Sequence, residues 1–496
     1  MSQVFDQVQP APANLKRASV RGAAATGAGQ AVKFALKFGS TAILARLLTP
    51  EDFGLVAMTT VIVGFAAVFK DAGLAAATVQ SEAITQAQIS TLFWINAAVG
   101  SCIALLVLTL SPCVAAFYDE PRLRAVTMAL APTFLLGGFT VQHHALLRRQ
   151  MRFNALAGLE VTSMLTGIVV GVTMAALGYG YWSLVGLSLG MAVANLVGVW
   201  VMVRWVPDRP GRGAEVKSLL KFGRDVLSFD VVNYFTRNAD TLLIGWYWGP
   251  VSLGFYDKAY NMLLLPIRQI NAPLAAVAVP TLSRARPDAD QFRSLYLNTL
   301  QLVASISVPV VFAIALFAPE IVRLWLGPGW ERCAVLFQLL AVAAVIGAIS
   351  NPIGWLLVSL GHTQRYKQMG LFSSAVTVAA FLLGLPHGAE GVAVAYSISG
   401  LLLFLPTWIF ALRGTGIRRG DVARNVLPAL ASCLVASASA WVCLHAIPAE
   451  PFVWVRPLAA AISFSGVYAY LLLVHYQRWT LLRGILKQFG TPSAAR

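Results

Sequence analysis

Charged and polar residues interrupt an apolar stretch at residues 221–248. Asp230, Asn233, Arg237 and Asp240 recur at helical spacing, so in an α-helix they fall within an arc of roughly 80° on one face. The stretch is long enough to cross a bilayer, where each central Arg or Asp costs roughly 2.5 to 3.5 kcal/mol. We therefore expect this face to line a protein interior or a water-filled cavity.

Two other interpretations of this stretch remain open. It could be an amphipathic surface helix, although the apolar residues LLIGWYW directly follow the charges. It could also be a spanning helix in which Arg237 and Asp240, one turn apart, only neutralise each other. We favour a functional role, because ionisable groups inside a membrane usually mark a substrate or ion path.

A second polar face is predicted near the N-terminus. Lys33 and Lys37 share an arc of about 80° with Thr26, Gln30 and Ser40. The alternative for Lys33 is snorkelling, in which its aliphatic stem lets the ammonium reach the membrane interface. Lys37 lies a turn deeper, so we expect it to face a cavity.

A third polar face combines Asp257, Asn261, Arg268 and Asn271 within a similar arc. Glu160 stands alone early in another apolar segment, with no partner evident from the sequence. The segments after residue 295 hold almost no charge at membrane depth. This concentration of charge predicts one polar cavity.

The predicted cavity suits an anion. Arg binds phosphate oxygens through its planar fork and Lys binds them as a point charge. We assign Lys33, Lys37, Asn233, Arg237 and Arg268 to the binding of such an anion in this cavity. Asp230, Asp240 and Asp257 form a second group that either couples H⁺ or Na⁺ to transport or holds the arginines in place.

Other chemistry finds little support in this sequence. The five cysteines are scattered without CxxC spacing, so we expect no metal centre and no disulfide framework. No acid/base pair, nucleophile elbow or glycine-rich phosphate loop rises above chance. We predict no catalytic residue and no cofactor apart from a coupling ion.

Composition identifies an integral membrane protein. The 496 residues are 58% hydrophobic and 12% charged, with a mean hydropathy of +0.70. The formal net charge of +16 resides in short loops between apolar segments, which indicates membrane orientation and no nucleic-acid partner. Lys and Arg gather in alternate loops, so both termini are predicted to be cytoplasmic.

Fourteen membrane spans are predicted from apolar runs near 20 residues, which makes the fold all-α and polytopic. Hydropathy alone could miss four of them, at 27–48, 53–79, 222–248 and 252–282. The other predicted spans are 88–110, 123–145, 156–177, 181–204, 295–318, 333–360, 367–386, 390–412, 427–446 and 453–475.

A weak internal repeat suggests two pseudo-symmetric lobes of six helices, followed by two extra helices. TPEDFG at 49–54 matches GPVSLG at 249–254 in its Pro and final Gly, and both follow a charged span. The domain boundaries predicted from this are a disordered cytoplasmic tail (1–22), an N-lobe (23–204), a cytoplasmic linker (205–221), a C-lobe (222–412), two C-terminal spans (413–476) and a cytoplasmic tail (477–496).

Several segments resemble the polysaccharide-transport (Wzx-type) flippases of the multidrug/oligosaccharidyl-lipid/polysaccharide exporter superfamily, most closely the colanic acid or succinoglycan branch. They are LARLLTPEDFGLVAM at 44–58, GPVSLGFYDKAY at 249–260, VPTLSRARPD at 279–288, LGPGWERCAVLFQLLA at 326–341 and NPIGWLLVSLGHTQRYKQMG at 351–370. The similarity covers nearly all of 25–475.

This resemblance implies a transporter of the bacterial inner membrane and not an enzyme. Such proteins flip undecaprenyl-pyrophosphate-linked oligosaccharide repeat units by alternating access, for exopolysaccharide or lipopolysaccharide biosynthesis. The implied partners are the lipid-linked oligosaccharide, membrane lipids, a polysaccharide polymerase and chain-length machinery. We expect residues 27–204 to rock against 222–412.

Two alternatives have different consequences. A cation-coupled multidrug exporter of the same superfamily would usually carry cations, which a cationic cavity disfavours. A membrane-embedded glycan polymerase or ligase would need a long periplasmic loop, and the sequence predicts only short connections.

Overall fold

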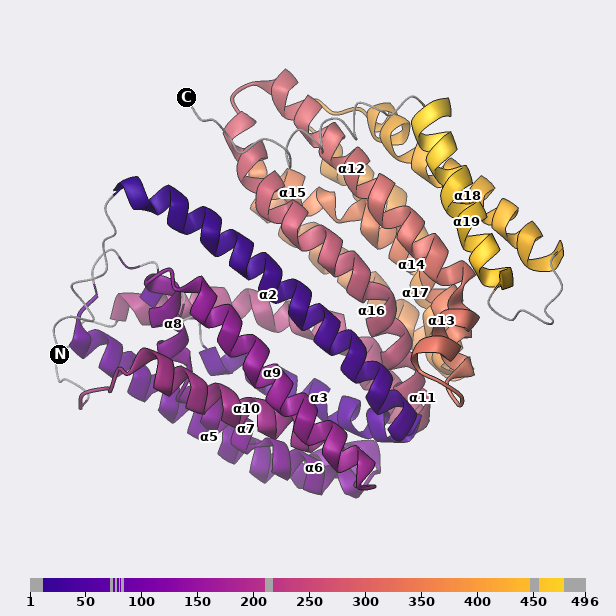
Figure 1. Ribbon diagram of the computed structural model, residues 1–496. Helices are drawn as coiled ribbons and strands as arrows, with labels where there is room; N and C mark the ends of the chain where they lie inside the picture. Colours follow the sequence, from indigo (N-terminus) through magenta and orange to yellow (C-terminus); the bar gives the residue numbers. More distant parts are fainter. Residues whose placement is uncertain are drawn as a thin grey trace. The chain divides into compact units, whose positions relative to one another are not determined.

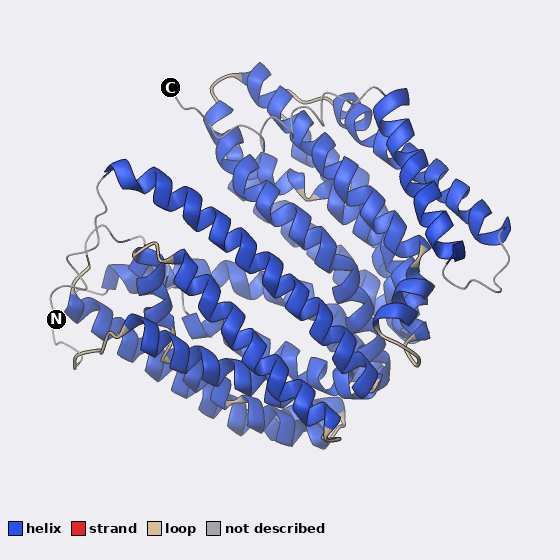
Figure 2. Cartoon of the chain, viewed as in Figure 1, coloured by secondary structure: helices blue, strands red, loops and turns tan. Residues whose placement is uncertain are grey.

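The computed structural model describes residues 12–71, 75, 78–79, 81, 84–209, 217–446 and 455–476. The side chains of residues 12–26, 28, 70–71, 217–233 and 236 lie outside this description. Every regular element in the described part is a helix, as Figure 2 shows, which confirms the all-α prediction.

The helices of the first half are α2 (Pro12–Leu47), α3 (Pro50–Asp71), α5 (Gln86–Tyr118), α6 (Arg122–Leu130), α7 (Pro132–Gly138), α8 (Val141–Arg149), α9 (Phe153–Ala176), α10 (Trp182–Val203) and the long α11 (Lys217–Ala285). The remaining elements are α12 (Ala289–Leu316), α13 (Ala318–Trp325), α14 (Glu331–Ser350), α15 (Pro352–Ser359), α16 (Thr363–Gly384), η1 (Leu385–His387), α17 (Gly388–Leu412), α18 (Arg419–Ala446), α19 (Val455–Tyr470) and η2 (Leu471–His475).

These helices account for the fourteen predicted spans. The bent run from α6 to α8 forms the fourth span, α14 continues into α15 as the tenth, and α11 contains two spans that meet at Gly249. Gly249 has φ 75°, a conformation that glycine adopts without the steric penalty of a side chain. Length and composition alone select ten of the described helices. Of the four spans that we expected hydropathy to miss, α2 is missed, whereas α3 and the Arg237–Ala285 stretch of α11 are selected.

Helix α2 begins at Pro12, inside the stretch 1–22 that the sequence predicts as a disordered tail. Proline suits the first position of a helix, because its missing N–H would have no partner there. The Ala, Leu, Lys and Arg residues that follow are strong helix formers.

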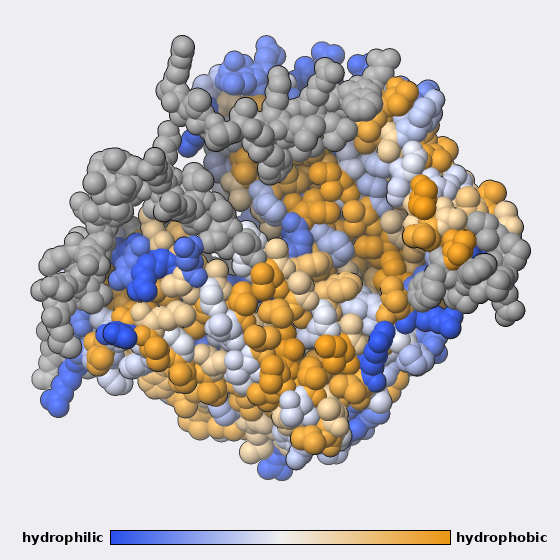
Figure 3. All heavy atoms as spheres, in the orientation of Figure 1, coloured by the Kyte–Doolittle hydropathy of each residue, from blue (hydrophilic) through white to orange (hydrophobic). Residues whose placement is uncertain are grey.

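Large apolar side chains cover much of the visible surface (Figure 3). Leu383, Leu402 and Leu105 are 77%, 68% and 63% exposed. Hydrocarbon tolerates these side chains, whereas a soluble monomer rarely exposes large apolar patches. The surface agrees with a protein that crosses the membrane many times.

The contacts divide the chain into two units. The first consists of Met1–Gly254 with Leu326–Gly329, and the second of Phe255–Trp325 with Trp330–Arg496. In the first unit, α9 packs along α2 and α10, and α5 packs on α6 and α7 (Figure 1). In the second unit, α17 packs on α14 and α16, while α12 packs on α14 and α18.

The two repeated turns cross each other inside the first unit. A Cβ added at Gly54 would collide with the backbone carbonyl of Pro250, and a Cβ at Gly254 would collide with the carbonyl of Pro50. Each proline begins a helical segment and each glycine follows four residues later. The matched residues of the repeat are therefore the residues that let the two segments touch backbone to backbone.

An ionic cluster joins the start of α3 to the turn before α6. Arg122 Nη2 lies 2.6 Å from Glu51 Oε1 and 2.8 Å from Glu120 Oε2. The hydrogen bond from Arg122 lowers the pKa of the Glu120 carboxyl, and that same bond raises the pKa of Arg122. The cluster lies at the end of the helices where the repeated turns also lie.

We expect Gly54→Ala to destabilise the protein, because a backbone carbonyl cannot rotate away from the added methyl group. Overpacking of this kind costs typically about 1 to 3 kcal/mol. The measurement is the thermal unfolding midpoint of the purified protein in detergent. Gly39→Ala on α2 is the matched control, since a Cβ there meets nothing within 4 Å. Equal midpoints for the two variants would contradict the close crossing.

We expect Arg122→Ala to lower the unfolding midpoint slightly at neutral pH, since surface ion pairs contribute at most about 1 kcal/mol. Because the folded-state pKa of Glu120 is lowered, the stabilisation exists above the unfolded-state value, about 4.3, and is lost as pH falls through the folded-state value. The difference between wild type and variant should therefore shrink in acid. A difference that grows in acid would contradict this assignment.

Candidate functional site

The polar stripe of α2 contains one paired and one unpaired cation. Lys33 Nζ lies 2.5 Å from Glu160 Oε2 on α9. The sequence suggested that Glu160 stands alone. In the structure it pairs with Lys33, because α2 and α9 pack side by side. Lys37 is exposed and makes no ion pair with any residue that the structure describes. The stripe thus presents its unpaired positive charge at Lys37.

The backbone around Lys37 is fixed by two hydroxyl groups of the following turn. Ser40 Oγ and Thr41 Oγ1 donate to the carbonyl oxygen of Lys37, at 3.1 Å and 2.8 Å. Hydroxyl groups in a membrane helix satisfy themselves in this way, since no water is available in hydrocarbon. Of the polar residues that accompany Lys37 on its stripe, Ser40 is therefore engaged with the backbone and Lys33 with Glu160.

In the first half of α11, Arg237 and Asp240 differ in solvent exposure, although the sequence predicted that they share one face. Arg237 is exposed, whereas Asp240 is 2% exposed and accepts a hydrogen bond from Thr241 N at 2.8 Å. Arg237 forms no ion pair within the described residues. The tuning role of Asp240 stays a prediction. The predictions for Asp230 and Asn233 fall on side chains outside the described ones.

The second half of α11 belongs to the second unit. Asn261 Nδ2 donates to Asp257 Oδ1 at 2.8 Å, and Lys258 Nζ lies 3.8 Å from Asp257 Oδ2. Arg268 is exposed and has no ion-pair partner among the described residues. Asn271 is 5% exposed, and its side-chain amide has no hydrogen-bond partner in this part of the chain. Of this stripe, Arg268 is the residue available to an anion.

Lys37, Arg237 and Arg268 therefore share one property. Each is an exposed cation on a spanning helix, without a carboxylate partner among the residues described. Their placement in one common cavity remains a prediction. Among the residues described, no group of three or more His, Cys, Asp or Glu side chains could hold a metal ion.

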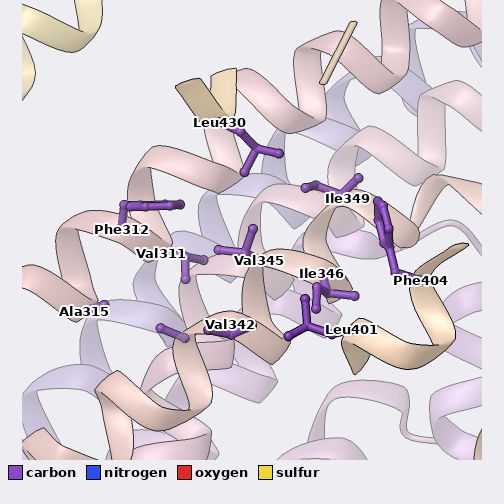
Figure 4. Close-up of a pocket in the computed structure, with 11 residues that line it drawn as sticks. Val311, Phe312, Ala315, Val342, Val345, Ile346, Ile349, Leu401, Phe404 and Leu430 are labelled. Atoms are coloured by element: carbon purple, nitrogen blue, oxygen red, sulfur yellow. The ribbon is translucent and has the colours of Figure 1, made fainter. Parts of the chain in front are cut away.

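A cavity of about 340 Å³ in the second unit is a different kind of site. Its walls are apolar side chains of α12, α14, α17 and α18 (Figure 4). Without a polar group it cannot orient a sugar or bind a phosphate. Three of the four helices carry an internal proline, and a proline removes one helical hydrogen bond and kinks its helix. These prolines each lie two residues from the cavity wall: Pro309 by Val311, Pro406 by Phe404 and Pro428 by Leu430.

We expect Ala341→Leu to fill part of this cavity and stabilise the protein, since cavity-filling substitutions commonly add about 0.5 to 2 kcal/mol. The matched control is Ala304→Leu, a fully buried position of α12 away from the cavity, where overpacking should lower the unfolding midpoint. Anion binding at the exposed cations should be unaffected by Ala341→Leu. Loss of anion binding in a stable Ala341→Leu protein would contradict our separation of this cavity from the site.

Known proteins with similar sequences agree with this architecture. A family described as polysaccharide biosynthesis protein matches residues 43–335. The lipopolysaccharide biosynthesis protein WzxC of Escherichia coli is 24% identical over 390 residues, covering 77% of this chain and 78% of that protein. The succinoglycan biosynthesis transport protein ExoT of Rhizobium meliloti is 24% identical over 458 residues, covering 91% and 92%.

A solved structure shares the fold. The lipid II flippase MurJ, in an inward closed conformation, superposes with a TM-score of 0.75 at 14% sequence identity, covering 92% of this chain and 99% of that one. At this identity the likeness concerns the fold alone. It agrees with the predicted all-α fold of about fourteen membrane helices.

Proposed function

We propose that this chain, which belongs to the polysaccharide biosynthesis protein family, translocates lipid-linked oligosaccharide repeat units across a membrane. Relatives named for lipopolysaccharide biosynthesis and for succinoglycan transport support a transporter and not an enzyme. The fold shared with a lipid II flippase agrees with a lipid-linked cargo. The translocated repeat units would serve exopolysaccharide or lipopolysaccharide biosynthesis.

One observation supports an anionic cargo most directly. Lys37 and Arg237 are exposed cations on spanning helices of the first unit, and no described carboxylate pairs with them. Each such charge costs roughly 2.5 to 3.5 kcal/mol at the bilayer centre unless water or an anion reaches it. A pyrophosphate would supply the missing negative charge, and the Arg fork can bind two of its oxygens at once.

The chemistry of the cargo follows from this. We propose an undecaprenyl pyrophosphate that carries an oligosaccharide, with Lys37, Arg237 and Arg268 as its anchoring cations. Lys33, Asn233 and the acids Asp230, Asp240 and Asp257 complete the proposed site. A coupling ion, H⁺ or Na⁺, would act at one of its carboxylates. We place the protein in the bacterial inner membrane with both termini in the cytoplasm and propose alternating access as its mechanism.

We expect Arg237→Ala to reduce transport by roughly 10- to 100-fold, because a hydrogen bond to a charged group contributes about 1.5 to 3 kcal/mol. Arg237→Lys keeps the charge but loses the planar fork, so it should retain intermediate activity. The measurement is surface glycan display together with the amount of lipid-linked repeat unit that accumulates in the membrane.

The matched control is Arg323→Ala, which removes an exposed arginine from the short helix α13. We expect full transport in this variant. Full transport in both Arg237 variants would remove Arg237 from the site. Export of cationic dyes with unchanged glycan display would instead favour a multidrug exporter, and retained polymer synthesis without any flipping would favour a polymerase or ligase.

A further inference from the structure

The pair between Lys33 and Glu160 lies where a phosphate is proposed to bind. Lys33 is on the stripe that includes Lys37, yet its ammonium already holds a carboxylate at 2.5 Å. The two side chains remain 23% and 34% exposed, so the pair can be reached from outside the protein. The Glu160 carboxylate therefore already pairs with Lys33, one of the cations that would bind the proposed cargo.

Local packing explains why this pair forms at Lys33. A Cβ at Gly29 on α2 would come within 2.9 Å of Ala157 Cβ on α9, so the two helices approach closely there. One turn further along each helix, Lys33 and Glu160 come within reach of each other. On the next turn α9 offers Ser163 and Gly167 and no carboxylate, which leaves Lys37 unpaired by α9.

Other ionisable groups near α9 are engaged elsewhere or distant from the pair. Helix α10 has no ionisable residue between Trp182 and Val203, and Glu160 is the one charged residue within α9. Helix α2 offers Lys33, Lys37 and Arg46 among its described side chains, and Arg46 lies about 20 Å along the helix from Lys33. Helix α8 carries four ionisable residues. His143 Nε2 contacts Trp205 O, and His144 Nε2 contacts Asn195 Oδ1. Arg149 donates to Thr78 O and Ser81 O, and Arg148 is exposed near the end of the helix.

We infer that Glu160 is an internal occupant of a phosphate subsite at Lys33, and that the incoming phosphate displaces it. This inference rests on the proposed function. In the exchange a phosphate oxygen replaces the carboxylate on the Lys33 ammonium. Glu160 then takes one proton from a hydronium ion of the surrounding water. Its carboxyl O–H bond forms as one hydronium O–H bond breaks, a water molecule is left, and no other covalent bond changes.

We expect Glu160 to become protonated because an apolar membrane disfavours a carboxylate without a cation. Glu160 lies seven residues into α9, about 10 Å along the helix from its start. An ionised carboxylate that has lost its cation on a membrane-spanning helix is disfavoured, and the neutral acid relieves this cost. Anion binding and proton uptake are therefore linked, and by reciprocity a lower pH should strengthen anion binding. Glu160 thereby becomes the coupling carboxylate, in place of Asp230, Asp240 or Asp257.

The test uses the full chain in lipid nanodiscs with inorganic pyrophosphate as the probe, and affinity is measured between pH 5.5 and 8. We expect E160Q to bind about tenfold more tightly than wild type at pH 7.5, within the usual range of coupling between sites. Wild type should approach this affinity as pH falls. The probe's own titration is common to both proteins, so their difference reports on Glu160. D290N, which removes an exposed carboxylate at the start of α12, should match wild type.

A second variant keeps the test valid if E160Q fails to fold. K33M/E160M replaces the pair by apolar side chains of similar size, an exchange that is often neutral for stability. It should bind pyrophosphate more weakly than wild type at pH 5.5. It should also take up about one proton fewer than wild type per pyrophosphate bound, measured by calorimetry in buffers of different ionisation enthalpy.

The outcomes separate this inference from the proposed function. If wild type, E160Q and K33M/E160M bind pyrophosphate with the same affinity at every pH, the pair is structural and the inference is overturned. If E160Q is merely less stable, with unchanged affinity, the same conclusion follows. If wild type binds no pyrophosphate at any pH, the proposed anionic cargo itself fails.

Discussion

A charge inside a bilayer needs a partner or access to water, and this constraint governs the polar residues of the protein. Lys33 meets it through Glu160, and Asp257 through Asn261 and Lys258. Lys37 and Arg237 remain exposed on spanning helices without a described ion pair. The same energetic cost thus distinguishes the charges that hold helices together from those that are available to a charged cargo.

Helix packing decides which charges become paired. In a membrane the hydrophobic effect does not drive helices together, so close backbone approach carries much of the specificity. Gly29 brings α2 onto α9 at the level of the Lys33 pair, and Gly54 and Gly254 bring two repeated turns into contact. The small residues are therefore as informative about the site as the charged ones.

The apolar cavity shows why concavity alone does not locate a transport site. It is well formed, yet it has no group that could recognise a phosphate or a sugar. Three of the four helices around it carry a proline within two residues of its wall. Family membership and the exposed cations support the transport function on separate grounds.

The sequence alone determined the membrane class, the fourteen spans and the repeated turns, because hydropathy, loop charge and turn residues act locally along the chain. It also predicted that Lys33, Lys37, Arg237 and Arg268 are cations at membrane depth, and this assignment stays a prediction. It could not pair Lys33 with Glu160, 127 residues away, or bury Asp240 while Arg237 stays exposed. Those distinctions depend on which helix faces pack together, and only the tertiary structure decides that.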